Sequence, residues 1–596
     1  MFPARKGAGH RRRRRGPIAV GVAALGGGTA AVLLMSSAHA GTVQPPAFRT
    51  AAHPKAPASA ALSARIAGAV KADHGRSRAS LSAPTTTSGK AATKVDPKII
   101  GGTPTTISTA PWMAQLWYYD DKGTADTADD VGFFCGGTVV SPTKILTAAH
   151  CVHGFDWYDY GAVLTGTDQL PTDNGDGTSD LHGGTATAVW RQWNHPSYST
   201  VTYDNDVAVL TLDGSTTATP LPLTTADDSA SYVAGTNATL YGWGRTTSTN
   251  EDLSQTLKKA SLPITSNTAC SAEYGSDFVA GHMVCAGAPA TGSDAGTTSA
   301  CNGDSGGPLV VNGRIVGVVS WGVQDCVEEG AYSVFSRVST FAGAIDPRLD
   351  DTNLNGDDKA DLFAVTPAGE GYEYDSTGSN FAGRADAGAF QGLSVVRQAD
   401  MNRDDLQDLL VRTTGGQLYF LGGTGSQVLI GGGWNSMASI VIPGDLNGDG
   451  WPDLVGTDTG GTSWLYPGNG KGTLGARTKI GAGWNTYSGA IYGKGDLTGD
   501  GRPDAVARDT SGNLWLYKGT GNAAAPWAAR IKVGGGWNTY NAFAAVGDIT
   551  GDGHADLVAR DSGGTLWLYK GTGSASAPYA AKVRIGSGWN VYNLFG

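Results

Sequence analysis

The sequence predicts an all-β protein with more than one folded unit, and three observations support this fold class. The chain has 596 residues, which is too long for one ordinary domain. Its 89 glycines gather in turn-like clusters between short β-branched and aromatic runs, such as Ile315 to Trp321. From about residue 350, an acidic loop recurs at intervals of 45 to 52 residues, which is typical of a repeat architecture.

Residues 1–40 are typical of an export signal peptide. Arg11 to Arg15 form a basic region, residues 17–35 are apolar and small, and residues 38–40 read Ala-His-Ala, a small-x-small cleavage site. A membrane anchor is the alternative, but the glycine run at 26–28 and the cleavage site weigh against it. No other segment is long and apolar enough to span a bilayer. We therefore expect a secreted, extracellular protein without a membrane span in its mature form.

Residues 41–98 are rich in Ala, Ser, Thr, Pro and Lys and show little hydrophobic periodicity. This composition predicts a pro-segment that is mostly flexible, with a simple linker as the alternative. The sequence that follows, Lys98 and then Ile-Ile-Gly-Gly at 99–102, favours the pro-segment.

Charge is divided unevenly along the chain. Residues 1–98 carry 16 basic and 2 acidic side chains, a net charge of +14. Residues 99–596 carry 27 basic and 51 acidic side chains, a net charge of −24. A folded part this acidic repels phosphate backbones and attracts cations, so we expect no nucleic-acid partner.

Three segments between residues 99 and 346 carry the groups that peptide hydrolysis needs. His150, in the run Thr-Ala-Ala-His-Cys, supplies a base, and Asp206, in the run Asp-Asn-Asp-Val-Ala, supplies a carboxylate that orients it. Ser305 supplies the nucleophile in the run Gly-Asp-Ser-Gly-Gly-Pro, whose glycines let the backbone turn tightly. A lone His is usually structural and a lone Asp-x-Asp usually a turn, so the combination carries the prediction.

In the order His, Asp, Ser, these motifs closely resemble the trypsin/chymotrypsin family, and the resemblance covers nearly all of residues 99–346. It implies a chymotrypsin-like fold of two six-stranded antiparallel β-barrels with the active site between them. It implies a serine endopeptidase that acts on protein or peptide substrates without a catalytic cofactor. Ser305 would attack the scissile carbonyl and His150 would carry its proton. Asp206 would orient His150, and the amides of Gly303 and Ser305 would form the oxyanion hole.

All six cysteines fall in this region, and an even count in an exported chain indicates disulfides, although six cysteines allow 15 pairings. The family resemblance implies three particular pairs: Cys135–Cys151, Cys270–Cys285 and Cys301–Cys326.

The resemblance also implies a zymogen that is activated by cleavage after Lys98. The freed amino group of Ile99 would pair with Asp304, beside the nucleophile. That ion pair would order the oxyanion hole and the specificity pocket, provided that the surrounding hydrogen bonds fit.

Two alternatives remain open for the side chain before the cut. In trypsin-like members an Asp six residues before the nucleophile selects Lys or Arg, and here that position is Ser299. Gly322 and Gly330 match the usual glycines of the pocket wall, so an open, neutral pocket favours large apolar or aromatic side chains. The alternative is that Glu328 or Glu329 enters the pocket and restores a basic preference. The substrate backbone would lie along Ser320, Trp321 and Gly322.

Five acidic loops in the C-terminal part place oxygen-bearing side chains at relative positions 1, 3, 5 and 9. Alternate side chains of this kind converge on a hard cation, and their recurrence favours calcium over plain acidic turns. An EF-hand is excluded, because no helices are expected beside the loops and the Glu at position 12 is missing. The candidate ligands are Asn353, Asn355, Asp357, Asp361, Asp400, Asn402, Asp404, Asp408, Asp445, Asn447, Asp449, Asp453, Asp496, Thr498, Asp500, Asp504, Asp548, Thr550, Asp552 and Asp556.

The repeats resemble the FG-GAP/VCBS repeat, which builds β-propeller blades. The first unit lacks the Gly-Trp-Asn strand that precedes the later loops, and the chain ends with a surplus copy at 588–592. We therefore expect this last strand to complete the first blade and to close a ring of five over residues 347–596.

Together these features predict a secreted serine endopeptidase with a calcium-bound accessory propeller. The alternative is a binding or adhesion protein in which the propeller has the main role, with an extracellular polysaccharide, protein or cell surface as its ligand. The recurrent Trp and Tyr residues suit sugar stacking, although most are expected in the blade cores. The intact set of catalytic residues favours the enzyme.

Overall fold

The computed structural model describes residues 44–50, 57–72 and 99–596, apart from residues 125, 251, 350–351 and 488–489. The predicted signal peptide and Lys98 lie outside the described residues. No helix within the described ranges has the length and apolar character needed to cross a membrane.

The first half of the protease region is an antiparallel sheet in the order β8-β5-β2-β3-β4-β10-β9. Strands β2 and β3 form a long hairpin, and both strands are buried almost throughout, because aromatic and aliphatic side chains fill both of their faces. The strands are β2 Met113–Asp120, β3 Val131–Ser141, β4 Lys144–Thr147, β5 Gly161–Thr165, β8 Thr185–Thr187, β9 Val189–Asn194 and β10 Ala208–Leu212.

The second half is an antiparallel sheet in the order β1-β12-β11-β14-β15-β16-β13. Each half has seven strands rather than the expected six, because the short edge strands β8 and β1 pair with β5 and β12. The strands are β1 Thr103–Pro104, β11 Asn237–Gly242, β12 Lys258–Pro263, β13 Met283–Ala286, β14 Pro308–Val311, β15 Arg314–Trp321 and β16 Ser333–Arg337.

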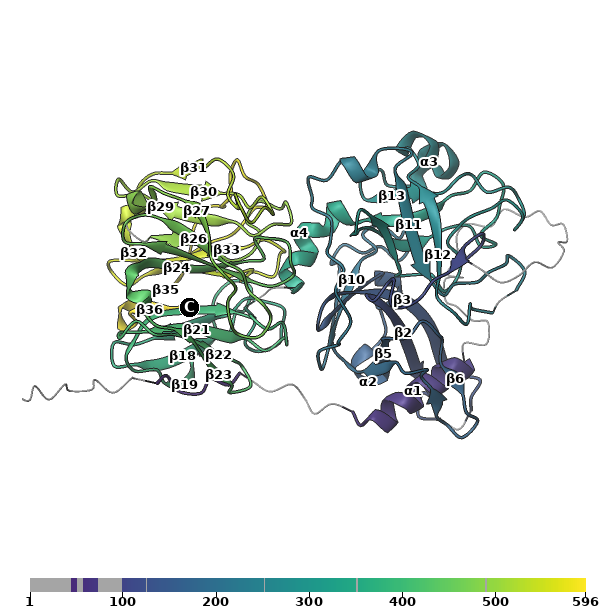
Figure 1. Cartoon of the computed structure of the whole chain (residues 1–596), viewed down its shortest axis with the longest axis horizontal. Coiled ribbons are helices and arrows are strands. Elements are labelled where there is room, and N and C mark those ends of the chain that lie inside the picture. Colours follow the sequence, from purple (N-terminus) through teal and green to yellow (C-terminus); the bar gives the residue numbers. More distant parts are fainter. Residues whose placement is uncertain are drawn as a thin grey trace, which may run out of the picture. The chain divides into compact units, whose positions relative to one another are not determined.

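Short elements connect or cover these sheets (Figure 1). They are the hairpin of β6 Thr172–Asp173 and β7 Ser179–Asp180, and the helices α2 Trp157–Tyr160, α3 Asn267–Tyr274 and α4 Val338–Leu349. Ser266 caps α3, since its hydroxyl accepts the amide of Ala269 at 3.2 Å.

A helix, α1 Ser59–Ala72, packs on the first sheet, so this part of the expected flexible segment is ordered. Leu62, Ile66 and Ala69 lie on one face of α1 and are buried in the core formed by β2 and β3. The prediction that this segment is flexible was wrong for α1. Its few large apolar residues are too widely scattered among Ala and Ser to reveal a helix in the sequence, and they become buried only because β2 and β3 pack against them.

The C-terminal region is a five-bladed β-propeller of four-stranded antiparallel sheets. Blade 1 combines β17 Leu362–Val365, β18 Glu370–Tyr374 and β19 Ala385–Ala389 with the last strand of the chain, β36 Leu594–Phe595. The other blades are β20 Leu393–Ala399, β21 Asp408–Thr413, β22 Leu418–Leu421 and β23 Gln427–Gly431; β24 Met437–Gly444, β25 Asp453–Asp458, β26 Ser463–Tyr466 and β27 Thr478–Gly481; β28 Ile491–Tyr492, β29 Ala505–Arg508, β30 Leu514–Tyr517 and β31 Ile531–Gly534; and β32 Tyr540–Gly547, β33 Asp556–Asp561, β34 Leu566–Tyr569 and β35 Val583–Gly586.

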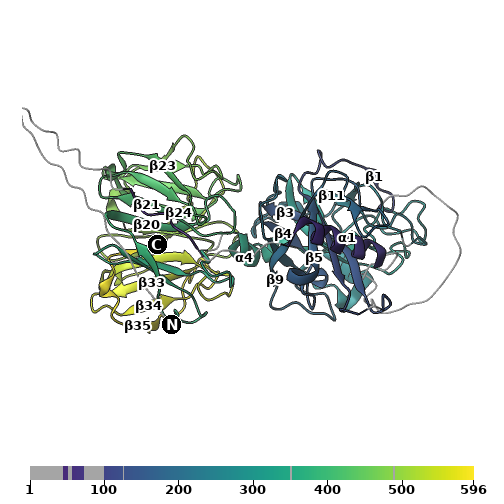
Figure 2. The same ribbon diagram turned by 90° about the horizontal axis from the view of Figure 1, so that it is seen from below.

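The ring closes as expected, but through a different segment of the chain end. The surplus Gly-Trp-Asn copy is not a strand: Gly588 has a φ of 84°, and a short helical turn follows at Trp589–Val591. Leu594 and Phe595 pair instead with Val365 and Ala364 of β17. Strand β36 also contacts β20 and β32, so the C-terminus lies inside the ring (Figure 2).

The tryptophans on the third strands of the later blades are already engaged within the protein. The indoles of Trp515 and Trp567 donate to Asp509 at 2.9 Å and to Asp561 at 3.0 Å. The guanidinium of Arg530 covers the ring of Trp515 with a separation of 4.0 Å from the ring centroid. A sugar that stacked on this face of the Trp515 ring would have to displace the cation.

We expect Phe595→Ala to destabilise the propeller by about 3 kcal/mol, because it removes a ring that closes the first blade. Phe595 is 7% exposed, whereas the nearby Val591 is 52% exposed. Denaturant unfolding of the full chain measures the effect, with Val591→Ala as the control. Equal stability of the two variants would contradict closure of the ring by β36.

Candidate active site

His150 lies in a short helical turn, Ala149–Cys151, directly after β4. The ring Nδ1 lies 2.8 Å from Oδ2 of Asp206, and the main-chain amide of His150 donates to Oδ1 at 2.8 Å. The disulfide between Cys135 and Cys151 ties this turn to β3. Two bonds from one residue to one carboxylate fix both the backbone and the ring of His150.

Asp206 is fully buried just before β10. Besides the two bonds from His150, its Oδ2 accepts the hydroxyl of Ser320 at 2.6 Å. The hydroxyl of Ser336 donates to the main-chain carbonyl of Asp206 at 2.8 Å. These three donors hold the buried carboxylate of Asp206 against His150. Sequence reasoning placed Ser320 along the substrate and did not find its contact with Asp206.

Ser305 lies in the turn that enters β14, and this turn packs against the segment that carries His150. The carbonyl of Ser305 accepts the amide of Gly136 at 2.8 Å. Gly306 has a φ of 80°, and a Cβ on it would lie 2.1 Å from the hydroxyl of Thr147 and 3.2 Å from the amide of Ala148. Only glycine permits so close an approach, which brings the nucleophile next to the His150 turn.

Two amides of the Ser305 turn are available to a substrate. Asp304 and Gly306 donate their amides to the carbonyls of Cys301 and Val319, both at 2.9 Å. The amides of Gly303 and Ser305 donate to no acceptor within the described ranges. Gly303 has a φ of 94°, in the left-handed region that favours glycine. This arrangement offers two donors to a developing negative charge.

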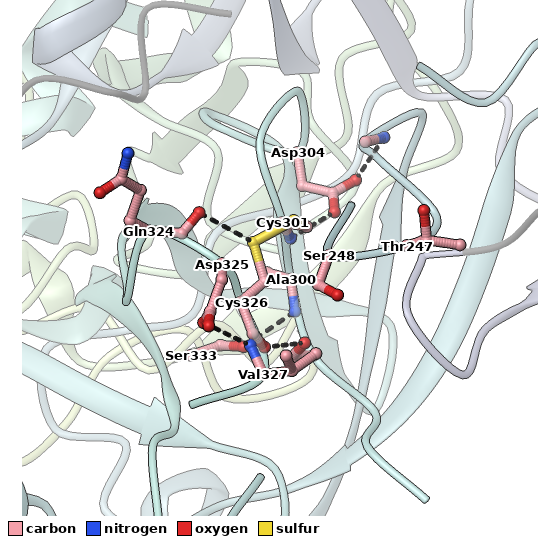
Figure 3. The surroundings of a disulfide bond; sticks show 12 residues. Thr247, Ser248, Ala300, Cys301, Asp304, Gln324, Asp325, Cys326, Val327 and Ser333 are labelled. Atoms are coloured by element: carbon pink, nitrogen blue, oxygen red, sulfur yellow. Dashed lines mark hydrogen bonds between the residues drawn. A yellow bond between two sulfur atoms is a disulfide. The ribbon is translucent and has the colours of Figure 1, made fainter. Parts of the chain in front are cut away.

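The carboxylate of Asp304 is completely buried behind this turn (Figure 3). Its oxygens accept the amides of Gly244 at 2.8 Å and Cys301 at 2.9 Å. A Cβ on Gly244 would lie 2.4 Å from this carboxylate, and one on Gly242 would lie 2.1 Å from it. Burial raises the pKa of Asp304 to about 7, because only main-chain dipoles compensate its charge.

Ser299, the residue predicted at the floor of the specificity pocket, carries a neutral side chain. The hydroxyl of Ser299 donates to the carbonyl of Cys326 at 2.8 Å, and the amide of Ala300 donates to the hydroxyl of Ser333 at 2.8 Å. Glu328 and Glu329 are exposed. Figure 3 shows Ser333 close to Ala300 and the Cys301–Cys326 disulfide.

The strand register brings Ser333, rather than Gly330, to the level of Gly322. Trp321 pairs with Val334, so Gly322 and Ser333 are the next residues on the two strands. Gly330 lies in the preceding turn, where a Cβ on it would meet the carboxylate of Glu273 at 3.2 Å. The length of the loop between the two strands did not reveal this three-residue difference between Gly330 and Ser333. The pairing of β15 with β16 does.

The three disulfides join the cysteine pairs that the family resemblance implied: Cys135–Cys151, Cys270–Cys285 and Cys301–Cys326. One close group of His and Cys side chains, consisting of His150 and the first of these pairs, is found among the described residues. Its two sulfurs are bonded to each other, so it offers no thiolate ligands to a metal.

The ninth residue of every acidic repeat loop has a structural role that the sequence did not reveal. In blade 3, Asp453 is fully buried, and its two oxygens accept the amides of Leu446 and Gly468, both at 3.0 Å. In each repeat this residue accepts at least one amide from its own loop and another from the residue 15 positions later. These aspartates fasten the loop to the strands that follow it: Asp361, Asp408, Asp453, Asp504 and Asp556.

In the third loop, the side chain at position 3 contacts the side chains at positions 5 and 9. The amide nitrogen of Asn447 lies 2.9 Å from an oxygen of Asp449 and 3.2 Å from an oxygen of Asp453. No repeat loop brings three carboxylates within 4.8 Å of one another, as far as the described ranges extend. Burial, followed by the charges of Asp445 and Asp449, raises the pKa of Asp453 to about 8.

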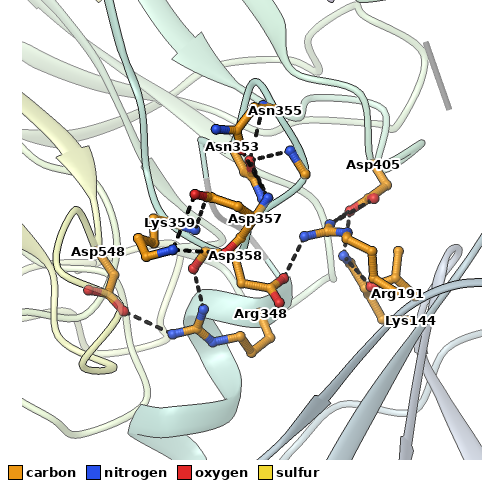
Figure 4. Close-up of polar contacts among 12 residues, drawn as sticks. Lys144, Arg191, Arg348, Asn353, Asn355, Asp357, Asp358, Lys359, Asp405 and Asp548 are labelled. Carbon is orange, nitrogen blue, oxygen red and sulfur yellow. Dashed lines mark hydrogen bonds and ion pairs between the residues drawn. The ribbon is translucent and has the colours of Figure 1, made fainter. Parts of the chain in front are cut away.

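Basic side chains already compensate some loop carboxylates (Figure 4). The guanidinium of Arg348 donates to Asp548, the first residue of the fifth loop, at 2.9 Å, and both side chains are buried. The guanidinium of Arg191 holds Asp405 of the second loop with two bonds of 2.9 Å. The five loops therefore differ in how much negative charge they leave for a cation.

Comparison with known proteins agrees with this geometry. The trypsin family matches residues 99–345, and the FG-GAP-like repeat family matches residues 445–507 and 496–559. The chain is 35% identical to a trypsin of Saccharopolyspora erythraea, covering 94% of that protein and 41% of this chain. It is 33% identical to trypsin delta of Drosophila erecta, covering 86% of that protein and 41% of this chain. It is 32% identical to brachyurin of Leptuca pugilator, covering 95% of that protein and 41% of this chain. With its all-β protease domain followed by FG-GAP-like repeats, the chain belongs to the trypsin family of serine endopeptidases.

Proposed function

We propose that this protein is a secreted serine endopeptidase whose catalytic residues are His150, Asp206 and Ser305. The main support for this proposal is that Asp206 accepts hydrogen bonds from the ring and the amide of His150, beside the Ser305 turn. Secretion is supported by three disulfides, which persist in oxidising compartments, and by the basic and apolar start of the sequence.

The reaction proceeds through an acyl-enzyme. Nε2 of His150 takes the proton of the Ser305 hydroxyl as its oxygen attacks the scissile carbonyl. The amides of Gly303 and Ser305 donate to the oxyanion, and the carboxylate of Asp206 stabilises the imidazolium. His150 then passes the proton to the leaving amine, and water hydrolyses the ester by the same steps in reverse.

The neutral pocket selects apolar side chains before the cut. Ser299 and Ser333 place hydroxyls rather than a carboxylate at the floor and wall, so a buried Lys or Arg would lack a counter-charge there. Ser333 also narrows the pocket relative to a glycine at the same position.

We expect the enzyme that starts at Ile99 to cleave unstructured peptides after apolar residues. Ser305→Ala should lose at least a thousandfold in kcat, because the nucleophile is removed while binding is retained. A peptide library analysed by mass spectrometry measures both the rate and the residue before each cut. Cleavage mainly after Lys or Arg would overturn the neutral pocket, and equal cleavage by Ser305→Ala would overturn the catalytic assignment.

The buried carboxylate of Asp304 supports a zymogen that is activated by a cut after Lys98. Ile99 is fully buried in the core of the second sheet, and the carbonyl of the next residue, Ile100, accepts the amide of Ser299. Cleavage would turn the amide of Ile99 into an ammonium. This group would supply the positive counter-charge that the carboxylate of Asp304 lacks. Pairing the two would order the Ser305 turn and the pocket beside it.

We expect Asp304 to make the uncut chain less stable as the pH rises from about 4 to about 7. The folded chain keeps a proton that the unfolded chain has already lost, so the free energy of unfolding falls across this window and stays low above it. Asp304→Asn in the Ser305→Ala background should remove a fall on the order of 4 kcal/mol.

Denaturant unfolding at pH 4 and pH 8 measures this difference between the Asp304→Asn chain and its parent. The other buried carboxylates titrate in both chains and cancel in the comparison. A difference that does not change with pH would show that Asp304 is charged before activation.

We propose that the repeat loops bind calcium and that calcium stabilises the propeller. Asp445, Asn447, Asp449 and Asp453 supply oxygen ligands in the third loop, and a bound cation would offset the burial and the neighbouring carboxylates that raise the pKa of Asp453. Asn447 already contacts both Asp449 and Asp453, and turning its amide would point its oxygen between them. The fifth loop, whose Asp548 is paired with Arg348, should bind more weakly.

We expect calcium at 100 times the dissociation constant to stabilise the propeller by about 2.7 kcal/mol for each occupied loop. Chelation should therefore lower the unfolding temperature. Asp449→Ala should remove one site from a calorimetric titration, whereas Glu370→Gln, an exposed carboxylate outside the loops, should leave the number of sites unchanged. Unfolding that is insensitive to both calcium and chelator would contradict the proposal.

A further inference from the structure

Two pieces of the segment that precedes Ile99 are packed into the folded protein. Residues 44–50 lie on the propeller, and helix α1, residues 59–72, lies on the first sheet of the protease domain. The activation cut after Lys98 would fall 26 residues beyond the end of α1. The contacts of both pieces are therefore independent of the bond that is cut.

Helix α1 packs directly against β2 and β3, and its apolar face is buried. Ile66 is fully buried, and Ala69 is fully buried beside it. A Cβ on Gly132 of β3 would lie 2.5 Å from the side chain of Ala72, and a Cβ on Gly68 would lie 2.3 Å from the ring of Tyr119. Glycines on both partners thus let the helix backbone approach the sheet.

Polar contacts fix the register of α1 along the sheet. The guanidinium of Arg65 donates to the carbonyls of Gly161 at 2.9 Å and Tyr158 at 3.3 Å. The side chain of Arg65 is half-buried, and this burial lowers the pKa of its guanidinium. At the other end, the ammonium of Lys71 lies 3.7 Å from the carboxylate of Asp173.

The second piece inserts a phenylalanine between the first two blades of the propeller. Phe48 is 1% exposed, and its ring centroid lies 5.8 Å from that of Phe363 and 6.3 Å from that of Phe390, both in edge-on geometry. The amide of Thr50 donates to the carbonyl of Gly423 at 3.1 Å. The side chain of Gln427 donates to the carbonyl of Pro45 at 2.7 Å.

Helix α1 lies away from the catalytic residues. Helix α1 contacts Tyr119 and Gly132, which pair with each other across β2 and β3. Gly136, whose amide holds Ser305, lies four residues further along β3, roughly 13 Å away. A segment bound in this place can stay while substrate occupies the cleft.

We propose that residues 44–72 stay bound after activation as a second, non-covalent chain with one anchor on the propeller and one on the protease domain. This inference rests on the proposed cleavage after Lys98. The mature enzyme is then a complex of the chain that starts at Ile99 and its own pro-segment. The binding face on the protease domain is formed by β2, β3 and β5, and the binding face on the propeller by blades 1 and 2.

The test separates retention of the segment from activation of the enzyme. In the full chain without its signal peptide and carrying Ser305→Ala, residues 94–97 are replaced by four aspartates, so that enteropeptidase cuts after Lys98. Native size exclusion followed by intact-mass analysis of the enzyme peak should find the fragment 41–98 in equal amount with the chain from Ile99. Loss of the fragment from the enzyme peak under native conditions would overturn the proposal.

Matched substitutions identify the anchors. Phe48→Asp with Ile66→Asp should release the fragment, whereas Ala47→Asp with Ala64→Asp, at exposed neighbouring positions, should retain it. Equal release by the two pairs would overturn the assignment. Circular dichroism before the cut identifies a substituted chain that fails to fold. In that case, hydrogen exchange of α1 in the parent chain decides whether the fragment is retained. Protection of its amides that persists after the cut supports retention, and protection lost on cutting overturns it.

The same cut made in the chain that keeps Ser305 reports on activation alone. If the cut chain shows no gain in activity, the zymogen proposal fails, while the chromatography of the Ser305→Ala chain still decides whether the segment is retained.

Discussion

Both halves of the chain bury aspartate carboxylates, and the main-chain amides that these carboxylates accept hold the loops around them in place. Removing a carboxylate from water costs several kcal/mol unless hydrogen bonds or a positive charge replace the lost hydration. Asp206 meets this requirement with His150 and Ser320, and Asp453 meets it with amides from its own loop and from the turn at Gly468. Moving a loop away would leave a buried polar side chain without its hydrogen bonds, so each of these aspartates restrains the backbone around it.

In the protease domain, this constraint aligns groups from distant parts of the sequence. The residues around Asp206 bring together the turn after β4, the start of β10 and the end of β15. Asp304 differs from Asp206, because its partners are only amide dipoles and its pKa is raised to about 7. In the proposed zymogen, a newly formed amino terminus would supply the counter-charge that this buried carboxylate lacks, and the carboxylate lies in the residue next to Ser305.

In the propeller, the same kind of carboxylate is used once in every blade. The aspartate at the ninth loop position fastens its loop to the turn 15 residues later, which explains its recurrence without reference to a metal. The carboxylate at position 5 also has a recurrent but local task, because in every loop it accepts the amide of the residue two positions later. The repeat pattern thus combines a structural residue with candidate ligands, a distinction that spacing alone does not make.

The motifs around His150, Asp206 and Ser305 predicted the protease fold because each is short, local and chemically specific. The structure brings these segments together, and the disulfide pairs follow the family pattern. Predictions that depended on strand register were less accurate. Gly330 was expected in the pocket wall, but the pairing of Trp321 with Val334 gives that position to Ser333. The number of residues between two strands does not show how many of them belong to the turn, so it does not fix which residues pair across the strands.

The sequence by itself determined the fold class, the order of the domains, the number of blades and the chemical groups of the active site, because these follow from local motifs and their repetition. Only the tertiary structure decided which residues share a pocket, which strand closes the ring and whether the early segment is ordered. The packing of Ile66 and Phe48 illustrates the reason. A few apolar residues in an otherwise small and polar segment have no core of their own, and they become ordered only where distant strands provide one.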